Sequence, residues 1–518
     1  MHISHVVGVA YLRRQALEMT ISFYFFAAAI LFGSIADAQI KTNPQDRKIL
    51  NYIYNATEDR THKIYNWTNW GNSSSTSNPC TDNWFGITCV EDQSVYYVSG
   101  ISLPRHELRS LPDEIIEMKH LQTLVIADNY IRSRDFPEGI FAIQTLEYLD
   151  IGNMYSLNIS LPREMSLPNL QQLYASKSQI NGVLPITWNT PKLESILLDG
   201  NNLVGYLPDD IGKITTLKQL MLQENQLSRI FPQSYGDLHQ LVNLSLVQSS
   251  HTQYRGLCSG IPDSWQAMFS LEYVSICVFG HLPDFIGENW QQLKTLKIVG
   301  GSYEGNITAS LCKLSQLEHL DFSYNQFTGA IPDCIFSMSS LIYLDLSNNQ
   351  LSGSIPEAIG TMTKIERLML SHNQLNGTLP RSIGKLTSIT QLELEDNLLI
   401  GAIPTEFDEL RNIGHSIAVN LQYNMLSSIE DGLQYFFEEV HGQYYDNPFE
   451  CPLPTYVHEA TCSLCNSGTK RNSCEDCVSA GCGWCSYGSN CIEGSHEGPL
   501  NRYSCPEDYW SFETCREG

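Results

Sequence analysis

The stretch that decides the fold reads Leu341-x-x-Leu344-x-Leu346-x-x-Asn349-x-Leu351-x-Gly353-x-Ile355-Pro356. The same phrase recurs every 24 residues, with its first position at Leu317, Leu341, Ile365 and Ile389. Apolar residues alternate with polar ones around Leu344, which is typical of a short strand with one buried face. Repeats of about 20–29 residues with this spacing stack into a solenoid, because each coil buries its apolar face against its neighbours.

The asparagine of the phrase recurs as Asn129, Asn201, Asn225, Asn325, Asn373, Asn397 and Asn424. Its amide both donates and accepts hydrogen bonds, so stacked copies can satisfy backbone groups where the chain turns away from the strand. Gly353 permits a turn that a Cβ would obstruct, and Ile355-Pro356 starts the return path of the coil. The phrase therefore predicts strand, turn and return path in every repeat.

Phe327-x-Gly329-x-Ile331-Pro332 and Leu375-x-Gly377-x-Leu379-Pro380 repeat the ending of the phrase. In this ending the chain resembles the plant-type, 24-residue class of leucine-rich repeat proteins. The resemblance implies an α/β solenoid, a right-handed superhelix with a parallel sheet on its concave side, capped by disulfides. We expect about fourteen coils over residues 98–447. At about 4.8 Å per coil, the array would be about 65–70 Å long.

Both ends of the array carry cap sequences. Residues 46–54 predict a short helix, and they lead to Cys80-Thr-Asp-Asn-Trp84-Phe-Gly-Ile87-Thr-Cys89. This resembles the plant-type amino-terminal cap, here spanning 39–97, although Ile87 stands where the family has valine. The resemblance implies a Cys80–Cys89 disulfide with Trp84 packed on the first coil. A carboxy-terminal cap is expected at 448–464, where Cys451 would pair with Cys462 and Cys465 could compete.

Residues 1–38 predict a signal peptide. The apolar run 21–35 follows two arginines and ends in Ala36-Asp37-Ala38, a small-x-small cleavage pattern, and Met19 is an alternative start. The run is shorter than the ~20 residues of a membrane span, so we expect secretion without a transmembrane anchor of the protein's own. The net charge of −25 argues against nucleic acid or an anionic membrane as partner.

Sequons and cysteines also indicate that the protein passes through the secretory pathway. Asn-x-Ser/Thr sequons, the expected glycosylation sites, occur at Asn55, Asn66, Asn72, Asn158, Asn243, Asn306 and Asn376. All sixteen cysteines are expected in disulfides: Cys80, Cys89, Cys258, Cys277, Cys312, Cys334, Cys451, Cys462, Cys465, Cys474, Cys477, Cys482, Cys485, Cys491, Cys505 and Cys515.

Residues 465–518 form a small cysteine-rich unit. Cys474-x-x-Cys477 followed by Gly-Cys482-Gly-Trp-Cys485 resembles the plexin–semaphorin–integrin (PSI) domain, a disulfide knot that positions neighbouring domains. The resemblance implies the bridges Cys465–Cys482, Cys474–Cys515, Cys477–Cys491 and Cys485–Cys505. The two Cys-x-x-Cys pairs also have the internal spacing of zinc ligands, but four residues between the pairs is a tight fit for one site. An oxidising secretory route favours disulfides.

Residues that flank the buried leucines of each strand should face the concave side and form the ligand surface. We select Tyr148, Asp150, Tyr174, Glu194, Glu224, Tyr273, Lys297, His319, Asp321 and Arg367. Tyr343 and Asp345 occupy equivalent positions. However, Leu344-Asp345-Leu346-Ser347 is close to the consensus sequence of the family, so a structural role in the sheet also explains the presence of Asp345. Tyrosines add contact area and a polar tip, which suits binding of a protein or peptide.

Coils between residues 241 and 301 are irregular. The step from Leu241 to Leu271 is 30 residues and the next is 22, and the repeated asparagine is replaced by Ser249, Phe279 and Gly301. Residues 249–255 read as an inserted loop, which Cys258 and Cys277 could tether. Such loops on repeat scaffolds either reflect tolerated decay or form a binding face. Cys312 and Cys334, on the return sides of adjacent coils, could form a disulfide.

The pattern predicts recognition rather than catalysis. His319, Asp321 and Asp345 could be drawn as a catalytic or metal cluster, but no nucleophile motif, phosphate loop or His-Glu-x-x-His accompanies them. We expect a secreted non-catalytic protein that binds an extracellular protein, peptide or glycan through the concave face and the irregular coils, with no metal or cofactor. The alternative is a structural or adhesive matrix component, and an enzyme ranks third. A membrane co-receptor is a possible further partner.

Overall fold

The structure is a computed structural model that describes residues 41–57, 70, 78–228, 230–248, 258–413, 416–430, 433, 441–443 and 447, and short strands between 483 and 511. Several predictions therefore lie outside the described residues. These are the signal peptide, sequons Asn66 and Asn72, the inserted loop, the Cys451–Cys462 bridge and the cysteine pairings of the tail. Within the described ranges, no helix is both long and apolar enough to cross a membrane.

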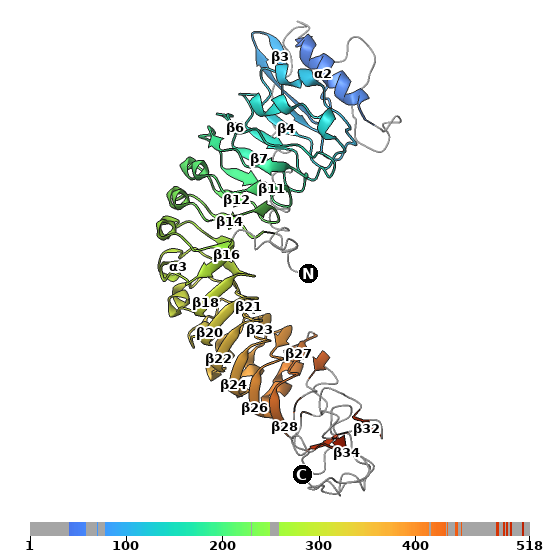
Figure 1. Ribbon diagram of the computed structural model, residues 1–518. Coiled ribbons are helices and arrows are strands. Elements are labelled where there is room, and N and C mark those ends of the chain that lie inside the picture. The colour runs from blue at the N-terminus through green and yellow to red at the C-terminus, as the bar shows by residue number, and fades with distance from the viewer. Residues whose placement is uncertain are drawn as a thin grey trace.

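The coils stack into a curved solenoid, seen as an arc in Figure 1. Parallel strands line its inner side and return turns form its outer side, which confirms the predicted repeat architecture. The inner strands are β3 (Val95–Ser102), β4 (Thr123–Val125), β5 (Tyr148–Asp150), β7 (Gln172–Tyr174), β10 (Ser195–Leu197), β12 (Gln219–Met221), β14 (Asn243–Ser245), β16 (Tyr273–Gly280), β17 (Thr295–Ile298), β19 (His319–Asp321), β21 (Tyr343–Asp345), β23 (Arg367–Met369), β25 (Gln391–Glu393), β27 (Ala418–Asn420) and β29 (His441–Gln443).

A second set of parallel strands follows the turn of most coils, and the sequence did not predict it. One group comprises β8 (Asn181–Val183), β11 (Asn202–Gly205) and β13 (Gln226–Leu227). The other comprises β18 (Ser302–Asn306), β20 (Gln326–Ala330), β22 (Gln350–Ser354), β24 (Gln374–Thr378), β26 (Leu398–Ile403) and β28 (Met425–Ile429). The stretch from Gln350 to Ser354, expected only to turn the chain, thus pairs with its neighbours on both sides.

Short helical turns carry the chain back along the outer side. They are η1 (Asp113–Glu117), η2 (Ser133–Asp135), η3 (Glu138–Ala142), η4 (Asp209–Lys213), η5 (Gln233–Asp237), η6 (Asp263–Ala267), α3 (Phe285–Asn289), η7 (Ala309–Lys313), η8 (Ile335–Ser337), η9 (Glu357–Thr361), η10 (Arg381–Lys385) and η11 (Thr405–Ile413). Coils 146–193 use the small pair β6 (Glu164–Met165) and β9 (Thr187–Trp188) instead.

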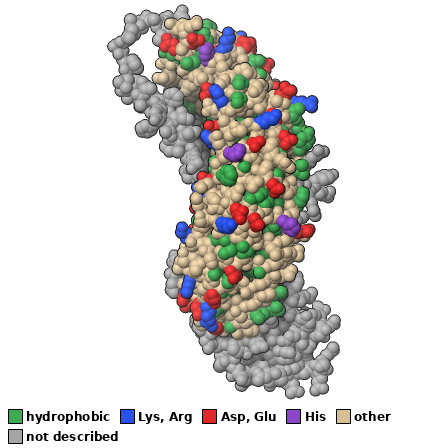
Figure 2. Space-filling view, turned by 90° about the vertical axis from the view of Figure 1, so that its left-hand side faces the viewer, with side chains coloured by type: hydrophobic (Ala, Val, Ile, Leu, Met, Phe, Trp, Pro, Cys, Tyr) green, Lys and Arg blue, Asp and Glu red, His purple; other side chains and the backbone are tan. Residues whose placement is uncertain are grey.

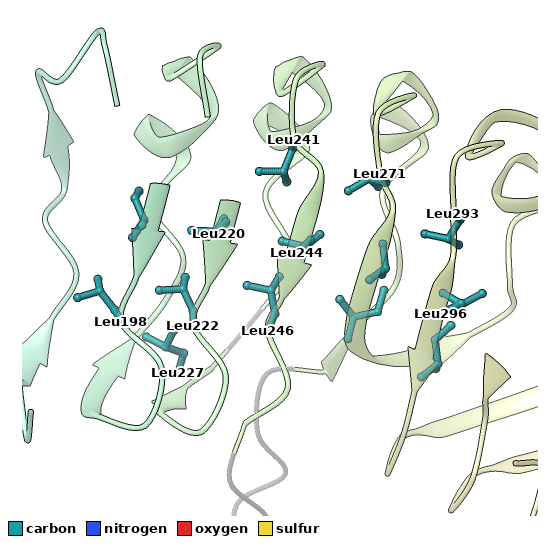
Figure 3. Close-up of a cluster of buried hydrophobic side chains, with 14 of the residues drawn as sticks. Leu198, Leu220, Leu222, Leu227, Leu241, Leu244, Leu246, Leu271, Leu293 and Leu296 are labelled. Carbon is teal, nitrogen blue, oxygen red and sulfur yellow. The ribbon is translucent and has the colours of Figure 1, made fainter. Parts of the chain in front are cut away.

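The core is a stack of leucine layers between the inner sheet and the return turns. Leu241, Leu244 and Leu246 of one coil are fully buried, and so are their equivalents in neighbouring coils. Figure 3 shows these side chains in rows that run from coil to coil. Burial of one such side chain stabilises the fold by roughly 1.5–3 kcal/mol relative to leaving it exposed. The repeat is therefore the unit of the core, as its period predicted.

Asparagines form the predicted ladder beside the inner sheet. The side-chain amide of Asn373 donates to Leu346 O at 2.9 Å, and its oxygen accepts the Leu351 N–H at 3.0 Å. The equivalent asparagines repeat this pattern, and Asn447 extends it by accepting the Leu426 N–H at 3.2 Å. Each asparagine thus joins two adjacent coils where their backbones turn.

The irregular coils differ from the prediction in one respect. Gln248, one residue before the expected Ser249, does the work of the ladder asparagine, since its side-chain oxygen accepts the Leu227 N–H at 3.1 Å. Downstream, β16 runs for eight residues and joins both sheets, pairing with β14 and β17 and then with β15 (Cys258–Ser259) and β18. At Gly301 the ladder is interrupted, and the side-chain oxygen of Asn325 has no hydrogen-bond partner among the described residues.

The amino-terminal cap closes the first coil. Helix α2 (Pro44–Asn55) begins two residues before the predicted start, because Asn43 caps it and Pro44 suits its first turn. Its Ile49, Leu50 and Ile53 are buried. Strands β1 (Lys41–Thr42) and β2 (Ile87–Asp92) flank β3. The rings of Trp70 and Trp84 lie 4.9 Å apart and are buried, which makes them core residues.

Disulfides join neighbouring segments within the described part of the chain. Cys80–Cys89 and Cys312–Cys334 are both present. Cys277 is disulfide-bonded, and its backbone pairs with that of Cys258 in the adjacent strand.

In the tail, β30 (Gly483–Cys485) pairs antiparallel with β31 (Asn490–Ile492) and β34 (Trp510–Ser511), and β32 (Gly494–Ser495) pairs with β33 (Gly498–Pro499). These strands do not test the predicted PSI pairings.

Candidate ligand-binding site

Constant spacing brings four polar side chains into one line across the inner sheet. His319, Tyr343, Arg367 and Gln391 precede the buried leucine or its equivalent in β19, β21, β23 and β25, and they are partners in register. We call these four residues the central row. Because Leu320, Leu344, Leu368 and Leu392 are buried, the alternation of the strand turns the central row toward the concave side.

Contacts within the central row hold its side chains in place. The His319 and Tyr343 rings are stacked with centroids 6.1 Å apart. The Arg367 guanidinium carbon lies 5.5 Å from the centroid of Tyr343, within cation–π range, and Arg367 Nε donates to Gln391 Oε1 at 2.8 Å. Both Tyr343 and Arg367 remain partly exposed. The row is therefore an ordered aromatic and cationic surface that can accept a ligand with little loss of side-chain entropy.

A second row follows the same strands on the other side of the buried leucines, consisting of Lys297, Asp321, Asp345, Met369 and Glu393. Asp345 is buried, with 8% of its surface exposed. Its Oδ1 accepts the Ser347 N–H at 2.9 Å and hydroxyl at 2.6 Å, and Oδ2 accepts the Tyr343 hydroxyl at 3.2 Å. Asp345 thus orients the Tyr343 hydroxyl and holds the turn at Ser347 by hydrogen bonds. It is a positioning residue rather than a direct ligand contact.

Burial governs the protonation of this pair. Desolvation raises the pKa of Asp345, and the Asp321 carboxylate one coil away raises it further, although hydrogen bonds from Ser347 lower it. Desolvation and the same two carboxylates raise the pKa of Tyr343 well above its ordinary value. The Tyr343 hydroxyl therefore stays protonated at physiological pH and remains a hydrogen-bond donor.

The raised pKa of Asp345 gives a prediction for stability against pH. A carboxyl whose pKa is raised by folding stabilises the fold most below its unfolded pKa, and that contribution is lost as pH rises through the folded pKa. We therefore expect wild type to gain thermal stability between pH 7 and about pH 5. Asp345→Asn, which keeps an acceptor oxygen but carries no charge, should gain less.

The measurement is the midpoint of thermal unfolding at both pH values. Glu357, Glu406 and Glu430, whose pKa values are lowered by hydrogen bonds and ion pairs, lose their contribution only at lower pH. The exposed Asp237→Asn is the control, and it should gain as much as wild type. Equal gains in all three proteins would contradict the assigned cause.

Other selected residues lie away from the central row. Tyr148 and Tyr174 pack edge to face at 5.3 Å in β5 and β7, separated from β16 by β10, β12 and β14. Asp150 is 2% exposed and its Oδ1 accepts the Gly152 N–H, which makes it a turn residue rather than a ligand contact. Glu194 forms an ion pair with Lys218 at 2.9 Å.

Two further selected residues lie outside the central row. Glu224 lies in the turn after β12 with a φ of 57°, exposed at the edge of the concave surface. Tyr273 precedes the row in β16, in register with Thr295, which is in register with His319. His319, Asp321 and Arg367 are therefore brought together, with Lys297 beside Asp321. Tyr343 was not selected as a ligand residue, although its place 24 residues from both His319 and Arg367 was a signal for it.

On the outer face, the described residues form no comparable row of ordered polar side chains. In Figure 2, which looks onto the outer side of the arc, acidic and basic side chains are interspersed and hydrophobic atoms form small, separated areas. Ion pairs between coils account for part of this pattern: Arg381 bonds Glu406 at 2.7 Å and also pairs with Glu430. Among the described residues, no group of three or more His, Cys, Asp or Glu side chains could hold a metal ion.

Three parts of the chain match family models. Residues 43–90 match the leucine rich repeat N-terminal domain, and residues 281–351 and 364–386 match leucine rich repeats. Receptor-like protein 18 of Arabidopsis thaliana is 30% identical over 310 residues, which are 49% of this chain and 35% of that protein. Podocan-like protein 1 of Mus musculus is 26% identical over 44% of this chain and 36% of its own length. The chain thus spans about a third of the curated relatives it matches.

Solved structures give the same architecture. The plant peptide hormone receptor RGFR1 in complex with RGF2 is 26% identical, with a TM-score of 0.57 over 67% of this chain and 58% of that one. The PEPR1–AtPEP1 complex is 28% identical, with a TM-score of 0.58 over 74% and 59%. The chain is an ectodomain-like plant-type leucine-rich repeat protein with the amino-terminal cap of that class.

Proposed function

We propose that this protein binds an extracellular peptide or a peptide segment of a protein through the concave surface from β16 to β25. The observation that carries the proposal is the central row, in which Tyr343 is held between His319 and Arg367 and hydrogen-bonded from below by Asp345. Tyrosine and arginine are the residue types that most often dominate binding energy at protein interfaces. Flanking carboxylates at Asp321 and Glu393 add acceptors for backbone N–H or cationic groups of a ligand.

Two further findings support this function. RGFR1 and PEPR1, which share the fold at 26% and 28% identity, are in complex with RGF2 and AtPEP1. The disulfides Cys80–Cys89 and Cys312–Cys334 agree with an oxidising, extracellular environment, so we place the mature protein outside the cell. Recognition needs no catalytic group at the site. A membrane co-receptor is part of the same proposal, because HAESA is in complex with both IDA and SERK1.

We extend the proposal to the domain organisation of the chain. Residues 1–38 would be removed on secretion, the solenoid would present the site, and the tail from 465 to 518 would form a PSI-like disulfide knot that spaces the solenoid from its surroundings. The short antiparallel sheet of β30, β31 and β34, with Cys485 and Cys491 in paired strands, is compatible with such a knot.

The proposal predicts that binding depends on the central row. The probe is a phage-displayed library of random 12-residue peptides, selected on wild-type protein made in a eukaryotic secretory host. Selected peptides should bind Tyr343→Ala/Arg367→Ala at least about tenfold more weakly, because loss of one hot-spot contact costs about 1.4 kcal/mol or more. Dissociation constants are measured by calorimetry.

Tyr130→Ala/Arg132→Ala is the matched control, because it removes the same residue types from exposed positions outside the inner sheet. Its affinity should equal that of wild type. Failure to enrich any peptide, or peptides that bind both double variants equally, would contradict the proposed function.

A further inference from the structure

One sequon lies on the inner sheet. Asn243-Leu244-Ser245 forms β14, and Asn243 is in register with Gln219 of β12 on one side and Tyr273 of β16 on the other. Leu244 is fully buried and belongs to the leucine rows of Figure 3. Because successive side chains of a strand point to opposite faces, Asn243 faces the concave side. It is partly exposed, and its side-chain amide makes no hydrogen bond within the described part of the chain.

The other described sequons lie elsewhere. Asn55 ends helix α2 of the cap. Asn158 accepts a hydrogen bond from Asn181 of β8, Asn306 lies in β18 and Asn376 in β24, all along the second set of strands. All four are exposed. Glycans there would cover flanks of the solenoid, whereas a glycan on Asn243 would stand on the surface that faces a ligand.

We propose that Asn243 carries an N-linked glycan that closes the inner sheet to ligands between β12 and β16. The Asn243 amide nitrogen would form a bond to the anomeric carbon of a lipid-diphosphate-linked oligosaccharide; the amide loses a proton and the lipid diphosphate leaves. Transfer must precede folding, because Ser245 of the sequon is only 2% exposed in the folded chain. The glycan would separate Tyr148 and Tyr174 from the central row.

This boundary also sets the length of the ligand, a step that rests on the proposed function. The proposed site then runs from β16 to β25, which is five strand spacings of about 4.8 Å, or about 24 Å. An extended chain rises about 3.3 Å per residue, so this length accommodates about seven residues. The site therefore fits a short extended peptide segment rather than a protein surface that spans the whole arc.

The first test needs no ligand. Protein from a eukaryotic secretory host is treated with a glycan-removing amidase in heavy-oxygen water, and mass spectrometry detects the conversion of Asn243. Hydroxyl-radical footprinting then compares Tyr273, next to Asn243 in register, with Tyr343. We expect Asn243→Gln to raise oxidation of Tyr273 at least about twofold and to leave Tyr343 unchanged. Asn376→Gln, which removes a flank sequon, should change neither.

Enzymatic removal of the glycan from folded wild type gives the same comparison if Asn243→Gln folds poorly. An unoccupied Asn243, or equal oxidation of Tyr273 with and without the glycan, would overturn the inference. The binding arm uses the peptides selected on wild type. They should bind Asn243→Gln as tightly as wild type, because their main contacts lie on the central row, in β19 to β25. A library that yields no peptides would contradict the proposed function. The glycan occupancy of Asn243 and the oxidation of Tyr273 would still test the inference about the glycan.

Discussion

Asn397→Ala is expected to destabilise the coils from Ile365 to Ile403 by about 2–3 kcal/mol. The Asn397 side chain donates to Leu370 O at 3.0 Å and Leu394 O at 3.1 Å, and its oxygen accepts the Leu375 N–H at 3.0 Å. Neighbouring asparagines still serve both carbonyls: Asn373 bonds Leu370 O and Asn424 bonds Leu394 O. The Leu375 N–H, however, would be left buried without an acceptor, and this accounts for most of the cost.

Because a solenoid couples mainly nearest neighbours, the effect should be local. Hydrogen exchange measured by mass spectrometry should show faster exchange in peptides from coils 365–403 and unchanged exchange in the cap. The control is Gln374→Ala, which removes an exposed amide from the adjacent strand and should shift neither exchange nor the unfolding midpoint. Equal effects of the two variants would mean that the ladder contributes little to stability.

The repeat and its core could be predicted because they depend on local spacing. A 24-residue period places Leu344 and its equivalents at the same depth in every coil, and an alternating pattern determines which side chains are buried. The ladder asparagines follow from the same period. By contrast, the strand from Gln350 to Ser354 carries mostly polar residues, so it leaves no apolar alternation, and only its pairing with adjacent coils reveals it.

The candidate site could be predicted in part. His319 and Arg367 were selected by their place beside the buried leucines, and Tyr343 between them follows from the constant period. The burial of Asp150 and Asp345 could not be read from the pattern, because an exposed and a hydrogen-bonded carboxylate occupy the same strand position. Gln248 was missed for a similar reason: its longer side chain reaches the ladder from one residue earlier.

Gly287→Ala is expected to destabilise the return side by about 3 kcal/mol or more. Intrinsic helix propensity alone predicts the opposite, since alanine is favoured over glycine by about 1 kcal/mol within a helix. A Cβ on Gly287, however, would lie 2.0 Å from Ser310 O and 2.7 Å from Leu311 N of the next coil. Backbone of η7 cannot yield as a flexible side chain could, so α3 and η7 would have to separate.

The same arrangement recurs where Gly212 faces Ser234 and Gly384 faces Glu406, with backbone oxygen 2.4 and 2.2 Å from the added Cβ. Glycine at this position therefore sets how closely adjacent coils stack on the outer side, and hence the curvature that presents the central row. Gly260→Ala is the matched control, because its Cβ would meet nothing nearer than Phe279 O at 4.0 Å. The thermal midpoint should fall for Gly287→Ala and stay within error for Gly260→Ala; a rise for Gly287→Ala would show that propensity outweighs coil spacing.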